Sequence, residues 1–128
     1  MGQPVVHFEI IGKNPATLRA FYGELFDWQL RLGDATTEKV SDPGTYGFLD
    51  GSTTGDGDGI NGGVGGGPAH EPQVLFYVGV PDVEAALDRA TELGGKRLMG
   101  PEPSSGTFTV GRFTDPEGNV IGVAGPSA

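Results

Sequence analysis

Two residues near the start of the chain, His7 and Glu9, are of the types that carry out acid and base chemistry. They lie within the run from Val5 to Ile11, whose β-branched and aromatic residues are typical of a β-strand. Side chains alternate along a strand, so His7 and Glu9 share a face and could exchange a proton with a ligand. A purely structural role is an equally good interpretation of the two residues. In that case His7 is an interior hydrogen-bonded histidine, and Glu9 forms an ion pair with Arg112.

Composition limits the classes of function. The 128 residues include 8 basic and 17 acidic ones, which gives a net charge of −9, and there is no cysteine. We therefore expect no nucleic-acid partner, because this charge repels phosphates. No apolar stretch approaches the roughly 20 residues that span a bilayer, and Met1–Pro4 lacks the features of a signal peptide. We expect a cytoplasmic protein without a membrane partner.

The first half of the chain predicts four strands and one helix. Asn14 is a good helix cap, and apolar residues recur at helical spacing behind it. Residues 51–67 are so rich in glycine that we expect flexible flanks, which would permit a mobile lid, around one short strand. The segment 65–72 reads as a linker. The expected elements are strands at 5–11, 28–32, 45–49 and 60–64 and a helix at 15–26.

The second half repeats this order, with strands expected at 74–80, 96–99, 107–114 and 119–124 and a helix after Asp82. The stretch from Asp115 to Asn119 predicts the turn of a β-hairpin. A constant offset of 68 residues relates Leu75 to His7, Phe76 to Phe8, Asp82 to Asn14, and Leu93 to Leu25.

The repeat predicts one α+β domain, 1–128, made of two β-α-β-β-β modules at about 1–66 and 72–128. Neither half buries its sheet well alone, so we expect the modules to pack around a shared concave cavity. Strand parity places further residues on the same face as His7 and Glu9. The predicted ligand-binding residues on this face are Gln73, Leu75, Tyr77 and Arg112.

Three other residues receive structural interpretations. Tyr22 and Trp28 are expected to be core or dimer-contact aromatics rather than ligand stackers. His70, flanked by Pro68 and Pro72, is interpreted as a surface residue of the linker.

In order and spacing, four motifs together resemble the vicinal oxygen chelate superfamily, the group of glyoxalase I, bleomycin-resistance proteins and extradiol dioxygenases. They are Val6-His7-Phe8-Glu9, the helix end from Phe21 to Trp28, Gly59-Ile60-Asn61-Gly62-Gly63 and Asp115-Pro116-Glu117-Gly118-Asn119. The resemblance implies a cupped, incomplete eight-stranded barrel with a helix on the outside of each module. It also implies a homodimer.

The resemblance further implies where a metal would lie, because metal-dependent members hold a divalent ion with His or Glu from the first and last strands of each module. The matching positions here are His7, Asn61 or Gly62, Leu75 and Gly122. Leucine and glycine cannot coordinate, so we expect no metal cofactor. Gly62 and Gly122 are instead expected to widen the cavity and to be ligand-binding residues, because an organic molecule could lie where the ion would have been. Two alternatives stay open: an ion shared by His7 and Glu9, or a strand register that differs by one residue.

These observations leave three hypotheses. The first is a metal-free member of the superfamily that binds a small organic molecule in the cavity. The second is a glyoxalase-like lyase or isomerase in which His7 and Glu9 act as acid and base or as a reduced metal site. The third is a structural or regulatory protein that keeps only the fold.

Overall fold

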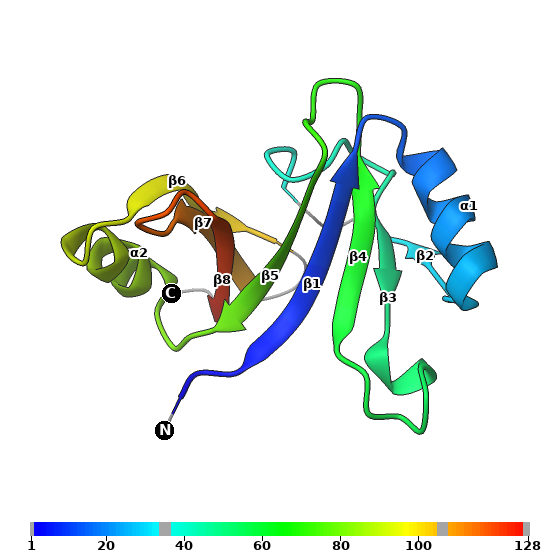
Figure 1. The fold of residues 1–128 in the computed structure, drawn as a ribbon, viewed down its shortest axis with the longest axis horizontal. Coiled ribbons are helices and arrows are strands. Elements are labelled where there is room, and N and C mark those ends of the chain that lie inside the picture. The colour runs from blue at the N-terminus through cyan, green and yellow to red at the C-terminus, as the bar shows by residue number, and fades with distance from the viewer. Residues whose placement is uncertain (1, 34–36, 105–107, 127–128) are drawn as a thin grey trace. The chain divides into compact units, whose positions relative to one another are not determined.

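The computed structural model describes residues 2–33, 37–104 and 108–126. It confirms the α+β class and two successive β-α-β-β-β modules (Figure 1). The first module is the compact unit His7–Val74, and the second combines Met1–Val6 with Leu75–Ala128. The boundaries of the two compact units therefore differ from the expected module boundaries, because the first residues of the chain belong with the second module.

The first module contains a four-stranded sheet in the order β2-β3-β4-β1, with α1 in contact with β4 (Figure 1). Strands β1 and β4 are parallel, and the other neighbours are antiparallel. Its elements are β1 (Val5–Gly12), α1 (Pro15–Phe26), β2 (Arg31–Leu32), β3 (Gly47–Leu49), the 3₁₀ turn η1 (Gly51–Thr53) and β4 (Asn61–Gly66).

Helix α1 has the predicted bounds. The Asn14 side chain accepts a hydrogen bond from the Thr17 backbone N–H at 3.2 Å, and Pro15 occupies the first helical position. The helix ends at Asp27, which has a left-handed φ of 58°. This turn directs the chain into Trp28.

An aromatic cluster forms around Trp28 and shortens the expected strand at 28–32 to two residues. The Trp28 ring lies 5.2 Å from Phe8, 5.7 Å from Tyr22 and 5.2 Å from Phe26, centroid to centroid. Packing of this ring takes precedence over ladder pairing. Tyr22 and Trp28 are both half-buried in this cluster, and their expected role as core or dimer-contact aromatics rather than ligand stackers stays a prediction.

Strand β4 is longer and more buried than its glycine content predicts. Gly62 to Gly67 are all buried, and the strand includes Gly65 and Gly66, which the sequence had assigned to a linker. The linker expectation is wrong at these two positions. Glycine is used here because neighbouring groups lie directly against the backbone: a Cβ on Gly66 would be 1.9 Å from the Gly12 carbonyl oxygen.

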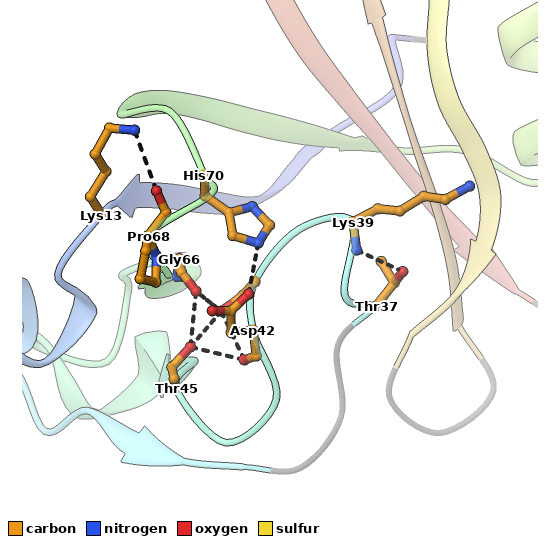
Figure 2. A network of polar contacts seen from close by, with 9 residues as sticks. Lys13, Thr37, Lys39, Asp42, Thr45, Gly66, Pro68 and His70 are labelled. Carbon is orange, nitrogen blue, oxygen red and sulfur yellow. Dashed lines mark hydrogen bonds and ion pairs between the residues drawn. The ribbon is translucent and has the colours of Figure 1, made fainter.

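Side chains from residues 41–45 hold the end of β4 in place (Figure 2). The Ser41 hydroxyl accepts from the Gly66 N–H at 2.9 Å, and the Thr45 hydroxyl lies 3.2 Å from the Gly66 carbonyl oxygen. His70 is also part of this network, because its Nε2 lies 3.2 Å from an Asp42 carboxylate oxygen and its side chain is only 16% exposed. The expectation of a surface histidine is wrong, since the neighbouring loop supplies a carboxylate partner.

The second module contains a sheet in the order β5-β8-β7-β6, with β5 and β8 parallel. Helix α2 contacts β6, β7 and β8, and Val83, Leu87 and Val123 form its core. The predicted hairpin between β7 and β8 is confirmed, with Asp115 accepting hydrogen bonds from the Glu117 and Asn119 N–H groups. The elements are β5 (Gln73–Gly79), α2 (Val83–Glu92), β6 (Lys96–Pro103), β7 (Phe108–Thr114) and β8 (Val120–Pro126).

Neither helix in the described part of the chain has the length and apolar character needed to cross a membrane.

Candidate functional site

His7 and Glu9 lie on one face of the first module and are joined by a third residue, Tyr46. The Tyr46 hydroxyl donates to the Glu9 carboxylate at 2.9 Å and lies 2.8 Å from Nε2 of His7. Glu9 is only 2% exposed, whereas His7 is half-buried. The predicted pair is therefore part of a three-residue chain of hydrogen bonds.

The directions of these bonds fix the tautomer of neutral His7. A tyrosine hydroxyl has one proton, and that of Tyr46 points to Glu9. Nε2 of His7 must therefore carry a proton and donate to the Tyr46 oxygen, so Nδ1 is the unprotonated nitrogen. Burial lowers the pKa of His7 below 6.5, and the negative charge of Glu9 opposes this shift. The lowered pKa favours the neutral ring near pH 7.

Tyr46 reaches this position because Gly63 has no side chain. In the β1–β4 ladder Glu9 pairs with Gly63, and a Cβ on Gly63 would lie 2.1 Å from atoms of the Tyr46 ring and hydroxyl. Phe48 also pairs with Gly63, from β3, and its ring centroid lies 6.2 Å from that of His7. Sequence reasoning missed Tyr46 and Gly63; the available signal was a tyrosine in the strand expected at 45–49.

Asn61 and Gly62 of β4, the positions that match a metal ligand of the superfamily, do not join His7 and Glu9 in this hydrogen-bonded group. Asn61 pairs with His7, but its amide oxygen accepts a hydrogen bond from the Gly51 N–H at 2.9 Å. Gly62 pairs with Phe8, and a Cβ there would be 2.0 Å from the Phe8 ring. Gly62 thus lies on the opposite face of the strand from His7, and the expectation that it widens the cavity is wrong, because the Phe8 ring fills the space.

The second module brings together Tyr77, Arg112 and Gly122. Gly122 pairs with Tyr77 on one side and with Arg112 on the other. Nε of Arg112 donates to the Tyr77 hydroxyl at 3.2 Å, and the two residues are 5% and 2% exposed. A Cβ on Gly122 would be 2.3 Å from the Tyr77 ring, so this glycine also leaves no free space. The expected widening at Gly122 is wrong for the same reason.

The last two predicted ligand-binding residues have less polar surroundings. Leu75 is buried, with 4% exposure. Gln73 lines an open groove of about 510 Å³ in the first module, together with Ile10 of β1, Leu18 of α1 and Lys13 from the connection between them. Ligand binding by Gln73 and Leu75 stays a prediction.

The residues at the implied metal positions do not fit a divalent ion. Leu75 and Gly122 offer no ligand atom, and the oxygen of Asn61 is already hydrogen-bonded. The alternative of an ion shared by His7 and Glu9 meets a steric obstacle, because the Tyr46 hydroxyl lies between the two groups at hydrogen-bond distance from each. About three protein ligands are usual for a catalytic metal. Among the described residues no group of three His, Asp or Glu side chains could hold an ion.

The fold agrees with the comparisons with known proteins. The sequence model of the Glyoxalase/Bleomycin resistance protein/Dioxygenase superfamily matches residues 5–123, so the chain belongs to this superfamily, to which the vicinal oxygen chelate proteins also belong. No curated protein matches the chain.

Solved structures with the same fold include methylmalonyl-CoA epimerase from Streptomyces coelicolor in complex with 2-nitronate-propionyl-CoA, with 15% identity, a TM-score of 0.66, and coverage of 98% of this chain and 99% of that chain. The methylmalonyl-CoA epimerase of Mycobacterium tuberculosis has 12% identity and a TM-score of 0.67, with 97% and 88% covered. A hypothetical protein from Bacillus halodurans C-125 has 15% identity and a TM-score of 0.66, with 100% and 97% covered. At these identities the likeness shows the fold.

Proposed function

We propose that this chain is a small-molecule-binding protein that works without the divalent metal of its superfamily and takes an organic ligand against the face that carries His7, Tyr46 and Glu9. The observation that carries the proposal is the Tyr46 hydroxyl, which lies 2.8 Å from His7 and 2.9 Å from Glu9. A ligand meets a preformed polar group there, and a metal ion would have to displace it.

Two surrounding features suit an organic ligand. The ring of Phe48 is stacked 6.2 Å from His7 and is 39% exposed, which gives an apolar surface beside the polar chain. Binding sites typically combine such apolar surface with a few fixed polar groups. His7 is half-buried, so it can contact a ligand while remaining fixed by Tyr46.

Charge narrows the class of ligand. The net charge of −9 disfavours polyanions. Two of the neighbours are methylmalonyl-CoA epimerases, and one of those structures contains a CoA ester, which carries several phosphate charges. We therefore propose a neutral or cationic organic ligand for this chain rather than a CoA ester. We also propose that the protein is a homodimer, as the superfamily resemblance implies. We further propose that it is cytoplasmic.

The test is a thermal-shift screen of neutral and singly cationic organic compounds, performed in EDTA. Compounds that raise the melting temperature of the wild type should raise it less in Tyr46→Phe, which keeps the ring and removes the hydroxyl. Tyr22→Phe is the matched control, because it removes a hydroxyl from the aromatic cluster elsewhere in the module. The proposal fails if no compound stabilises the protein, or if every stabilising compound acts equally on wild type and Tyr46→Phe.

A second function, proton-transfer catalysis by a lyase or isomerase, is favoured by the tautomer of His7. Nδ1 can accept a proton from a carbon or oxygen acid while Nε2 passes its own proton to Tyr46 and Tyr46 passes its proton to Glu9. The reverse sequence returns the proton, and the lowered pKa of His7 keeps the accepting form present at neutral pH.

The second function is tested by solvent deuterium exchange in EDTA, followed by NMR. The probes are methylmalonyl-CoA and the hemithioacetal of methylglyoxal and glutathione. Exchange that stops in both His7→Gln and Glu9→Gln would establish catalysis. Compounds that bind in the thermal-shift screen while neither probe exchanges would leave the binding function standing alone.

A further inference from the structure

We propose that the first module carries a second small-molecule site, for an organic ammonium ion, at the end of α1. An open pocket of about 430 Å³ lies there, lined by Phe26, Asp27 and Trp28 on one side and by Thr53, Thr54 and Gly55 on the other. Phe26 is the last residue of α1 and Asp27 and Trp28 follow it, whereas the other three residues belong to η1 and the chain after it. The volume is in the range of small-ligand sites.

Aromatic rings form one wall of this pocket. The Phe26 and Trp28 rings lie 5.2 Å apart at 44°, and Tyr22 stacks on Trp28 at 5.7 Å and 24°. The cluster holds Trp28 in place, while Phe26 is 52% exposed and presents ring surface to solvent. A cation over such rings is attracted to their negative faces.

The two threonine hydroxyls of the pocket can only accept hydrogen bonds from a ligand. The Thr53 hydroxyl donates its proton to the Asp50 carbonyl oxygen at 2.6 Å, and the Thr54 hydroxyl donates to the Gly51 carbonyl oxygen at 2.8 Å. Their backbone N–H groups donate to the same two oxygens, at 3.0 and 3.1 Å. These residues therefore offer a ligand only oxygen lone pairs.

Asp27 supplies the negative charge. Its side chain is exposed, and within the described ranges no ion pair involving it is formed. The segment from Asp50 to Gly59, which includes the lining residues Thr53, Thr54 and Gly55, contains three aspartates and no basic residue. An anionic, donor-poor pocket favours a cation and repels carboxylates and phosphates.

The aromatic wall favours an organic cation over a metal ion. Calcium takes six to eight oxygen ligands, whereas this pocket offers one carboxylate and two hydroxyls. A methylated or alkyl ammonium group carries a diffuse charge on apolar substituents, which suits rings and a single carboxylate.

This site is separate from the one that contains His7. The cluster around Trp28 includes Phe8, which alternates along β1 with His7 and Glu9 and so projects from the opposite face of the strand. A ligand at Trp28 therefore needs none of the groups in the proposed His7 site.

The experiment uses Trp28, the single tryptophan of the chain, as its own fluorescent reporter. The probes are choline chloride and its neutral isostere 3,3-dimethyl-1-butanol, titrated at constant ionic strength. Choline should change the emission saturably and the alcohol should not. Asp27→Asn should weaken choline binding by about three- to tenfold, as expected for a partly exposed charge beside aromatic rings. Asparagine also tolerates the left-handed backbone at this position.

Two control variants make the result specific. Glu24→Gln removes the same charge from exposed α1 surface outside the pocket and should leave the affinity unchanged. His7→Gln should also leave it unchanged, which separates this site from the proposed function. The inference is overturned if choline gives no saturable change, if the neutral alcohol binds equally well, or if Asp27→Asn behaves as Glu24→Gln does.

Discussion

The replacement Gly63→Ala should break the hydrogen bonds that join His7, Tyr46 and Glu9, although none of these three residues is itself replaced. The new Cβ would lie 2.1 Å from the Tyr46 ring, so the ring must move from 2.1 Å to about 3.4 Å, a displacement of about 1.3 Å. Bonds of 2.8 and 2.9 Å to His7 and Glu9 do not survive such a movement.

The expected cost follows from these two effects. Loss of hydrogen bonds that involve a buried carboxylate costs about 1.5–3 kcal/mol, and overpacking adds about 1–3 kcal/mol. Gly63→Ala should therefore lower the free energy of unfolding by about 2.5–6 kcal/mol, measured by urea denaturation. The matched control is Gly33→Ala, because nothing lies within 4 Å of a Cβ there, and its effect should stay within about 0.5 kcal/mol.

A double-mutant cycle identifies the cause. If the clash with Tyr46 dominates, Gly63→Ala should cost markedly less in a Tyr46→Ala background than in the wild type. Equal costs in the two backgrounds, or a cost no greater than that of Gly33→Ala, would refute the reasoning about the site.

Three further predictions concern the same residues and their counterparts in the second module. Because the pKa of His7 is below its ordinary value of 6.5, the unfolded chain binds this proton more readily, so stability from this group is full above pH 6.5 and falls as the pH drops towards the folded-state pKa. His7→Gln should flatten that part of the profile in urea denaturation, and an unchanged profile would contradict the prediction. Glu9→Gln should lower the pKa of His7 further, since the Glu9 charge raises it; an NMR titration that finds it raised would show that the Glu9 charge does not act on His7 in this way. Gly122→Ala should destabilise by about 1–3 kcal/mol because its Cβ would be 2.3 Å from the Tyr77 ring, and a calorimetric melting temperature equal to that of the wild type would disprove the close packing.

The fold was largely predictable because its signals are local and repeated. Asn14 and Asp82 cap the two helices as expected, and each cap side chain accepts from the backbone three residues on. The offset of 68 residues matches the starts of α1 at Pro15 and α2 at Val83. The sequence alone could not predict the length of β4, because glycine is a poor strand former unless other side chains cover it, and that cover comes from Phe8, Tyr46 and residues 41–45.

The candidate site was predictable only in part. Strand parity correctly placed His7 and Glu9 on one face, and Tyr77 and Arg112 together in the second module, whereas Gly122 followed from the superfamily resemblance. Parity could not show that Tyr46, which directly precedes β3, contacts both His7 and Glu9, because that contact depends on how β3 pairs with β4 and β4 with β1. Strand parity also does not show that the rings of Phe8 and Tyr77 fill the space beside Gly62 and Gly122.

The central claim, a site that works without a metal, is tested most directly by elemental analysis of protein purified without an affinity tag. The measurement is made before and after incubation with divalent manganese, cobalt, nickel and zinc followed by dialysis, and it is repeated on His7→Ala. The account predicts less than about a tenth of an equivalent of any of these metals in both proteins. A stoichiometric metal in the wild type that disappears in His7→Ala would contradict it, because the ion would have to replace the Tyr46 hydroxyl between His7 and Glu9.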